Sequence, residues 1–237
     1  MMKDFKRVFV AESDDLLWRA ELKKVLKTWI RCMDQFSTDE QLSGNYLPFW
    51  YNERAHVSFL AGAVWRSSRQ AFAVEEFRTR KGKGETRHVG RGDLLMKLGD
   101  TLVCAECKAV RPNIETSNPG PWDIARRQML KARSEVRGVN LRKVKHSARV
   151  GICFLAPKIP TARAKNFTQL REQFISWIKT QRREDPLALV KPTKRKKADF
   201  WAAYFPEYAA SAKIVGWERH RWPGVVLLGT TIGFGAE

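Results

Sequence analysis

The sequence predicts an α/β fold with a helix–strand–strand–strand–helix–strand core, and three observations support this fold class. The first is a pair of strand-like runs, joined by only two residues, near the middle of the chain. The second is apolar spacing of three and four residues, typical of helices, on either side of that pair. The third is a continuous apolar run after the second helix, typical of a buried strand. We expect the core over residues 48–156 of a single domain, with an N-terminal helical addition at 1–45 and a C-terminal helix and strand extension at 157–237.

The first two helices are predicted from their start signals and their spacing. Ser13 to Asp15 combine a capping hydroxyl with first-turn acids, and helical spacing continues to about Gln35. A second helix is expected from Pro48, a residue type favoured at the first helical position, to about Ser67. The apolar stripe of this helix contains one carboxylate, Glu53, and burying an acid is costly unless it is paired or binds a cation.

The two central strands are predicted to form a hairpin. Asp93 to Leu98 and Thr101 to Lys108 are joined by Gly99-Asp100, a connection that suits positive φ. Because side chains alternate along a strand, Glu106 and Lys108 share one face, and Asp93 can lie across the hairpin from them. Two carboxylates beside an ammonium group form a compact site for a hard divalent cation and for the phosphate that it polarises.

The remaining elements follow from alternation and spacing. In the first core strand, Phe72 and Val74 are expected on one face, and the aromatic segment from Phe200 to Tyr208 is interrupted by Pro206. The other predicted elements are a strand from Gln70 to Thr79, a helix from Trp122 to Arg137, a strand from Val150 to Ala156, a helix around Phe174 and a last buried strand from Val225 to Leu228.

Asp93, followed by Glu106-Cys107-Lys108, resembles the D…(D/E)xK signature of the PD-(D/E)xK, or restriction-endonuclease-like, nuclease superfamily. The proline that precedes the aspartate in the family name is replaced here by Gly92. The αβββαβ order of the predicted elements is also the core topology of that superfamily. The resemblance therefore implies a restriction-endonuclease-like fold and an endonuclease that hydrolyses phosphodiester bonds with Mg²⁺ or Mn²⁺.

The resemblance also assigns roles to individual residues. It implies that Asp93 and Glu106 hold the metal, with the main-chain carbonyl of Cys107 as a third ligand. Lys108 would orient the attacking water or stabilise charge growing on the phosphate oxygens.

Two further residues are assigned by the resemblance. Glu53 has two interpretations that stay open. It is an additional metal ligand, because many members carry an acid on this helix, or it is an ordinary acid that pairs with Arg54 or Arg66 or turns to solvent near the helix start. Gln128 is similar to a glutamine found on the following helix in several branches of the superfamily.

The charge of the chain favours a polyanionic partner. Forty-four Lys and Arg residues against 25 Asp and Glu residues give a formal net charge of +19, and neutralised phosphates release counterions. DNA is expected rather than RNA, because the resembled superfamily mostly cuts DNA. A solvated charged face is the alternative interpretation of the basic residues on the helix after the hairpin. These candidate phosphate contacts are Arg126, Arg127, Lys131 and Arg133.

Other chemistries lack their sequence motifs. The chain has no GxxxxGK[ST] loop, no GxSxG elbow and no HExxH group. The CAEC spacing does not favour zinc, because Cys104 and Cys107 point to opposite faces of a strand. The N-terminus has neither the pattern of a signal peptide nor an apolar stretch long enough to span a membrane, so we expect a cytoplasmic protein.

Two functions are consistent with these observations. The first is a metal-dependent nuclease from a restriction, defence, mobile-element or repair system, and the sequence leaves a homo-oligomer open. The alternative is a non-catalytic nucleic-acid-binding or interaction module on the same fold. The combination of Asp93, Glu106 and Lys108 favours the nuclease, because a binding module has no need of that trio.

Overall fold

The computed structural model describes residues 4–10, 18–39, 52–81, 88–114, 120–139, 141, 146–160, 166–180, 199–206 and 220–232. The elements within these ranges are β1 (Phe5–Val10), α1 (Arg19–Thr38), α2 (Glu53–Ser67), β2 (Phe72–Lys81), β3 (His88–Leu98), β4 (Thr101–Val110), α3 (Pro121–Arg137), β5 (Ser147–Leu155), β6 (Ile159–Pro160), α4 (Phe167–Thr180), β7 (Phe200–Phe205), β8 (His220–Arg221) and β9 (Val225–Ile232).

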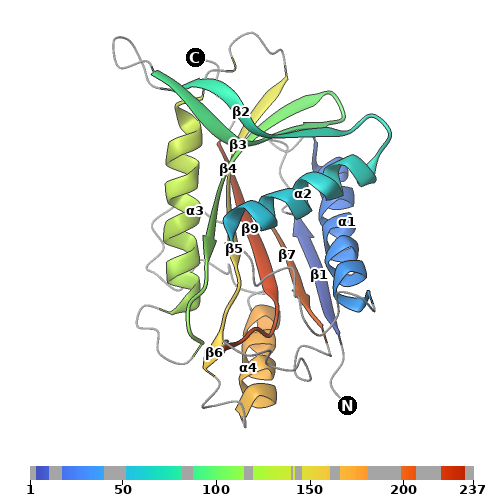
Figure 1. Ribbon diagram of the computed structural model, residues 1–237, viewed down its shortest axis with the longest axis vertical. Helices are drawn as coiled ribbons and strands as arrows, with labels where there is room; N and C mark the ends of the chain where they lie inside the picture. The colour runs from blue at the N-terminus through green and yellow to red at the C-terminus, as the bar shows by residue number, and fades with distance from the viewer. Residues whose placement is uncertain are drawn as a thin grey trace.

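A seven-stranded sheet in the order β1-β7-β9-β5-β4-β3-β2 forms the centre of the molecule (Figure 1). Strands β4 and β5 are parallel, and every other neighbouring pair in this sheet is antiparallel. The short strands β6 and β8 form a separate pair. The predicted succession of helix, three strands, helix and strand is present as α2, β2, β3, β4, α3 and β5.

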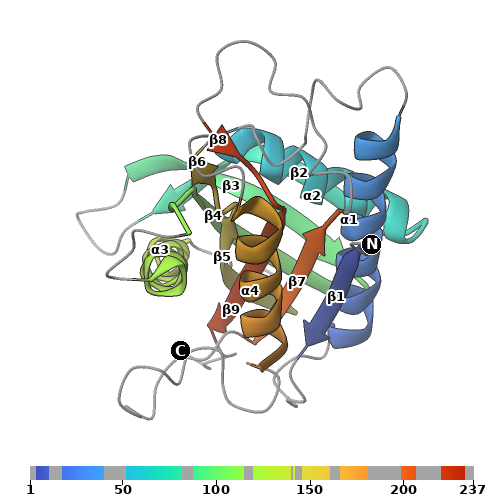
Figure 2. The ribbon, with the colours of Figure 1, turned by 90° about the horizontal axis from the view of Figure 1, so that it is seen from below.

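Helices cover both faces of the sheet, as the view in Figure 2 shows. One apolar core joins α1 and α2 to the sheet, and a second joins α3 and α4 to the opposite face. Strand β5 contributes to both cores: Phe154 packs with α1 and α2, whereas Cys153 and Leu155 pack with α3 and α4. Burial on both faces explains why this strand is a continuous apolar run in the sequence.

The N-terminal addition is not purely helical, contrary to the sequence prediction. Strand β1 lies at the edge of the sheet and pairs with β7, the aromatic segment that the sequence left unassigned. Lys6 and Arg7 interrupt the apolar pattern of β1, because an edge strand with exposed charges is tolerated where a central strand would not be. Lys6 forms ion pairs with Asp4 and with Asp34 of α1.

Helix boundaries also differ from the predicted ones. Helix α1 begins at Arg19, and the predicted start at Ser13 to Asp15 lies outside the described residues. Helix α2 begins at Glu53 rather than near Pro48, which also lies outside them. The side chain of Asn52 caps α2 by accepting a hydrogen bond from the backbone N–H of Ala55 at 3.2 Å.

The face of β2 that meets the core is formed by small residues. Ala71 and Ala73 belong to the core shared with α1 and α2, whereas Val74 is 45% exposed. The predicted shared face of Phe72 and Val74 is therefore the one turned away from that core. Helix α3 matches its predicted position closely, with Met129 and Val136 as buried members. Strand β9 begins at the predicted Val225 but continues to Ile232, beyond the predicted end at Leu228.

Candidate active site

The sheet forks between β3 and β4, and the candidate residues lie at this fork. The hairpin turns at Gly99, whose φ of 59° suits glycine, and pairing runs from Leu98↔Thr101 to Leu94↔Ala105. Beyond that point β3 stays with β2 and β4 stays with β5. Figure 1 shows β2 and β3 turning away from the remainder of β4.

Two carboxylates replace β3 as partners of the open edge of β4. Asp93 Oδ2 accepts a hydrogen bond from the backbone N–H of Cys107 at 2.7 Å. Glu53 Oε2, at the start of α2, accepts one from the N–H of Ala109 at 2.9 Å. These two N–H groups are two residues apart and therefore point to the same side of the strand. The side chains satisfy donors that a neighbouring strand would otherwise pair.

A cavity of about 500 Å³ opens beside these carboxylates. Two acids of the cavity have side-chain partners. Glu75 Oε2 accepts a hydrogen bond from Ser58 Oγ at 2.8 Å, and a carboxylate oxygen of Glu76 forms an ion pair with Arg54 at 2.7 Å. Glu76 lies between the register pairs Glu75↔Leu94 and Phe77↔Gly92 and has a φ of 51°, which is uncommon for a residue with a side chain. The cavity is lined by Glu53, Arg54, Val57, Ser58, Glu75, Glu76 and Asp93.

Glu106 and Lys108 lie on the face of β4 that α3 covers. Glu106 is only 2% exposed. The ammonium nitrogen of Lys108 lies 2.8 Å from Oε2 of Glu135 on α3. Neither Glu106 nor Lys108 lines the cavity that Glu53 and Asp93 share. The structure thus brings Glu53 and Asp93 together directly, with Glu106 and Lys108 on the adjacent face of the same strand end.

The charges at this strand end act on one another. Burial raises the pKa of Glu53, and the charge of Asp93 adds to that effect, whereas Lys108 opposes it; the net pKa is above its ordinary value. Burial lowers the pKa of Lys108, but the hydrogen bond and charge of Glu135, with the charges of Glu53 and Asp93, outweigh it and raise the pKa. Lys108 is therefore an ammonium ion at neutral pH.

The open edge of β4 has the donor chemistry of a hard cation site. A residue in a strand directs its N–H and C=O to the same side, so the Cys107 carbonyl lies on the edge that Asp93 and Glu53 contact. Carboxylate and carbonyl oxygens suit Mg²⁺ or Mn²⁺. Among the described residues, no group of three or more His, Cys, Asp or Glu side chains is arranged to hold a metal. Two of the three predicted carboxylates fit such a site, and buried Glu106 does not face it.

The thiol of Cys107 is a core group. Its side chain packs with α1 and α2, and that of Cys104 packs with α3, so the CAEC pair points to opposite faces as expected. Burial, and after it the carboxylates of Asp93, Glu53 and Glu106, raise the pKa of the Cys107 thiol well above its ordinary value. Its contribution to the site is thus through the main chain.

The predicted phosphate contacts on α3 are not equivalent. Arg127 and Lys131 are exposed, whereas Arg126 and Arg133 are half-buried. Arg133 Nε donates to the carbonyl of Thr231 on β9 at 3.1 Å, which gives it a packing role. Gln128 is half-buried and lies seven residues before Glu135 on the same face of α3.

Four residues of the site were missed by the sequence analysis: Ser58, Glu75, Glu76 and Glu135. Glu135 had a sequence signal, because it is the only acid between Ile124 and Lys165. The glutamates of β2 had none, since a pair of acids in a strand is typical of a solvated face. The predicted partners of Glu53 were also wrong: Arg54 pairs with Glu76, and Arg66 donates to the sulfur of Cys32.

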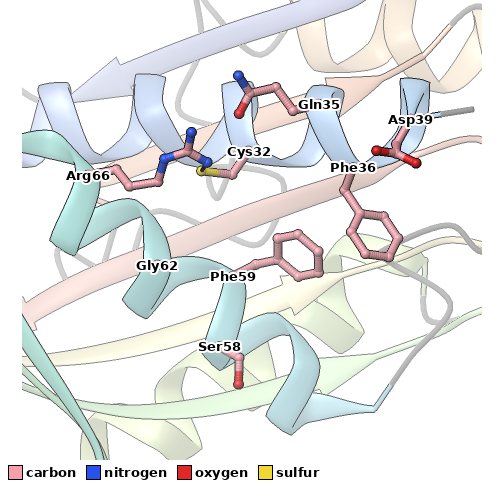
Figure 3. Close-up of a pocket in the computed structure, with 8 residues that line it drawn as sticks. All are labelled: Cys32, Gln35, Phe36, Asp39, Ser58, Phe59, Gly62 and Arg66. Carbon is pink, nitrogen blue, oxygen red and sulfur yellow. Dashed lines mark hydrogen bonds between the residues drawn. The ribbon is translucent and has the colours of Figure 1, made fainter. Parts of the chain in front are cut away.

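A second cavity, of about 470 Å³, lies between α1 and α2 (Figure 3). The rings of Phe36 and Phe59 meet edge to face there, with centroids 5.2 Å apart. Arg66 Nη1 donates to Cys32 Sγ at 3.7 Å. Ser58 lines both cavities, so the two are neighbours along α2.

No family model, curated protein or solved structure matches this chain. In the part of the chain that the structure describes, no helix is both long and apolar enough to span a membrane.

Proposed function

We propose that this protein is a Mg²⁺- or Mn²⁺-dependent endonuclease with a restriction-endonuclease-like core. The observation that carries the proposal is the pair of carboxylates, Asp93 and Glu53, that contact consecutive donors on the open edge of β4. They come from elements 40 residues apart in the sequence and converge where the D…ExK motif also places Glu106 and Lys108. A cavity beside them leaves room for a substrate phosphate.

In the proposed mechanism some residues of the fork bind the cation and another stabilises charge on the phosphate. Asp93, Glu53 and the Cys107 carbonyl would hold the cation. Glu106, the ligand that the resemblance adds, is buried on the α3 face of β4 and would reach the cation only after a change of side-chain rotamer. A bound divalent cation polarises the phosphate and makes water more acidic. Lys108, charged at neutral pH, stabilises the negative charge that grows on the phosphate oxygens.

The proposed substrate is nucleic acid, with DNA favoured over RNA by the resemblance alone. The net charge of +19 supports a polyanionic partner, and exposed Arg127 and Lys131 on α3 are candidate backbone contacts. Such contacts position a duplex without reading its sequence. A restriction, defence, mobile-element or repair setting fits an enzyme of this kind.

The test is incubation with supercoiled DNA, single-stranded DNA and RNA, each with Mg²⁺, Mn²⁺ or a chelator. We expect cleavage that requires the cation and is lost in a folded Asp93→Ala protein. Glu21→Gln, which removes a carboxylate from the surface of α1, is the matched control and should cut like the parent. Cleavage by Asp93→Ala at the parental rate would show that the assigned site is wrong.

The alternative, a binding or interaction module without catalysis, predicts a different outcome. The protein would then bind nucleic acid with the same affinity in chelator and in Mg²⁺, and no preparation would cut. Occupation of Asp93 and Glu53 by backbone N–H groups is the observation that fits this alternative, since a purely structural role needs no more than those bonds.

A further inference from the structure

Glu135 of α3 is an isolated acid in a strongly basic part of the chain. No other Asp or Glu occurs between Ile124 and Lys165. Lys131 lies one turn before it on the same helix, at the spacing that favours an ion pair. Its carboxylate nevertheless pairs with Lys108 of β4, 27 residues earlier in the sequence, at 2.8 Å. Glu135 therefore pairs with the lysine of the ExK motif and not with the nearby lysine of its own helix.

The pair is partly shielded from water. The exposed fractions are 21% for the Lys108 side chain and 35% for that of Glu135. Lysine loses up to about 2 kcal/mol of side-chain entropy when it is ordered, and this partner fixes its flexible stem before any substrate arrives. Glycine at position 151 brings α3 close to the sheet, because a Cβ there would meet the backbone nitrogen of Arg133 at 2.4 Å.

Lys108 has other anions within reach of its charge. Glu53 from α2 and Asp93 from β3 both attract its ammonium group. If Lys108 swung onto them, it would neutralise the carboxylates proposed to hold the cation. Glu135 attracts the ammonium from the opposite side, toward α3.

We propose that Glu135 is the positioning residue of Lys108: it holds the ammonium group on the α3 side of β4, away from Glu53 and Asp93. The carboxylates stay available for a cation, and the flexible lysine side chain keeps one orientation. This inference rests on the proposed nuclease function. It assigns to Glu135 a role that acts through Lys108 and not through contact with the reacting atoms.

The experiment measures Mn²⁺ binding without nucleic acid, from the free-ion signal in electron paramagnetic resonance. We expect Glu135→Gln to raise the Mn²⁺ concentration at half-saturation by about three- to tenfold, because Lys108 then competes for Glu53 and Asp93. In a Lys108→Met background the same substitution should have no effect. A direct field of Glu135 on the cation would instead persist in that background, so the double-mutant cycle separates the two.

Cleavage provides the second readout. Glu135→Gln should lower kcat by about tenfold with KM for DNA little changed, and Glu135→Asp, which keeps the charge, should recover part of the loss. Asp123→Asn is the control, since it removes one carboxylate from α3 about 18 Å along the helix from Glu135. Thermal melting of each variant identifies loss of folding, and if Glu135→Gln unfolds, Glu135→Asp carries the same test with a smaller expected change.

Two failures are distinguishable. A parent protein that neither binds Mn²⁺ nor cuts nucleic acid overturns the proposed function and this inference with it. A parent that does both, beside a folded Glu135→Gln variant with unchanged Mn²⁺ binding and kcat, overturns the inference alone.

Discussion

The two halves of β4 differ in what satisfies their backbone. From Leu102 to Ala105 the strand has main-chain partners on both sides, β3 and β5. From Glu106 to Val110 it keeps β5 on one side, while Asp93 and Glu53 supply the hydrogen-bond acceptors on the other. Main-chain pairing fixes the first half, whereas the second half depends on side chains that can exchange a backbone donor for a ligand. This difference explains why the candidate site lies beside the second half of β4 and not beside the first.

The largest expected effect is at the fork. Asp93→Asn should reduce cation-dependent cleavage by at least about a thousandfold, because the charge that holds a cation is worth several kcal/mol to the transition state. The amide oxygen can still accept the hydrogen bond from Cys107, so the melting temperature should change little. Single-turnover cleavage and a thermal melt check both points. A variant that melts like the parent and cuts as fast would remove the distinction between the two halves of β4.

His56 provides a contrasting polar group, one turn from Glu53 on α2 but inside the core. It is fully buried, stacks on Phe154 with centroids 4.9 Å apart, and neither ring nitrogen has a hydrogen-bond partner among the described residues. Burial, with the charge of Arg111, lowers its pKa from 6.5 to about 3. Because the unfolded chain takes up the proton first, stability is fully present above pH 6.5 and is lost as the pH falls toward 3.

This linkage predicts a loss of about 2 kcal/mol in unfolding free energy between pH 7 and pH 5 from His56 alone. His56→Leu should remove that part of the pH dependence. Urea unfolding of parent and variant at both pH values measures the difference. Equal pH dependence in the two proteins would mean that His56 is protonated or hydrated in the folded state.

Substitution of Glu53, the second carboxylate at the fork, distinguishes a cation ligand from a side chain that only accepts a backbone hydrogen bond. If it is a ligand, Glu53→Gln should raise the Mg²⁺ concentration needed for half-maximal activity by about tenfold, since one charge is lost from the cation site. The amide keeps an oxygen for the N–H of Ala109, so stability should be maintained. A lower melting temperature with an unchanged Mg²⁺ requirement would assign Glu53 to the fold alone.

The smallest effect is expected on the exposed face of α3. Replacing Arg127 and Lys131 by Ala should weaken DNA binding equally on unrelated sequences and reduce the slope of log affinity against log salt by about 1.8, or 0.9 for each lost phosphate contact. The control is replacement of exposed Lys23 and Lys27 of α1, on the other face of the sheet. Isotherms at several salt concentrations decide the matter, and an identical slope in all three proteins leaves α3 as a solvated face.

The hairpin and the order of the core elements could be predicted because their signals are local. Gly99-Asp100 defines the turn, and alternation separates Cys104 from Cys107. Strand β7 could not be recognised in the same way, because both of its faces are buried and its aromatic residues show no alternation. Strand β1 has its partner 200 residues away at Phe5↔Phe205, beyond any local pattern.

The candidate site was predictable in its residue types but not in its contacts. The motif identified Asp93, Glu106 and Lys108, yet Glu53 contacts the N–H of Ala109 across 56 residues. Whether a carboxylate meets an arginine or a backbone amide depends on where β3 leaves β4, and that point is set by packing of the whole sheet. For the same reason, the pairing of Lys108 with Glu135 could not be predicted, because it depends on how α3 packs beside β4.

The open edge of β4 has a consequence for the behaviour of the protein at high concentration. A strand edge with free N–H groups is a template on which a strand of another molecule can add, which leads to aggregation. Asp93 and Glu53 occupy two such donors, at Cys107 and Ala109, and repel the carbonyl oxygens of an incoming strand. The acids at the fork therefore disfavour intermolecular sheet extension at this edge, so variants that lose them should be handled as aggregation-prone proteins even when they melt normally.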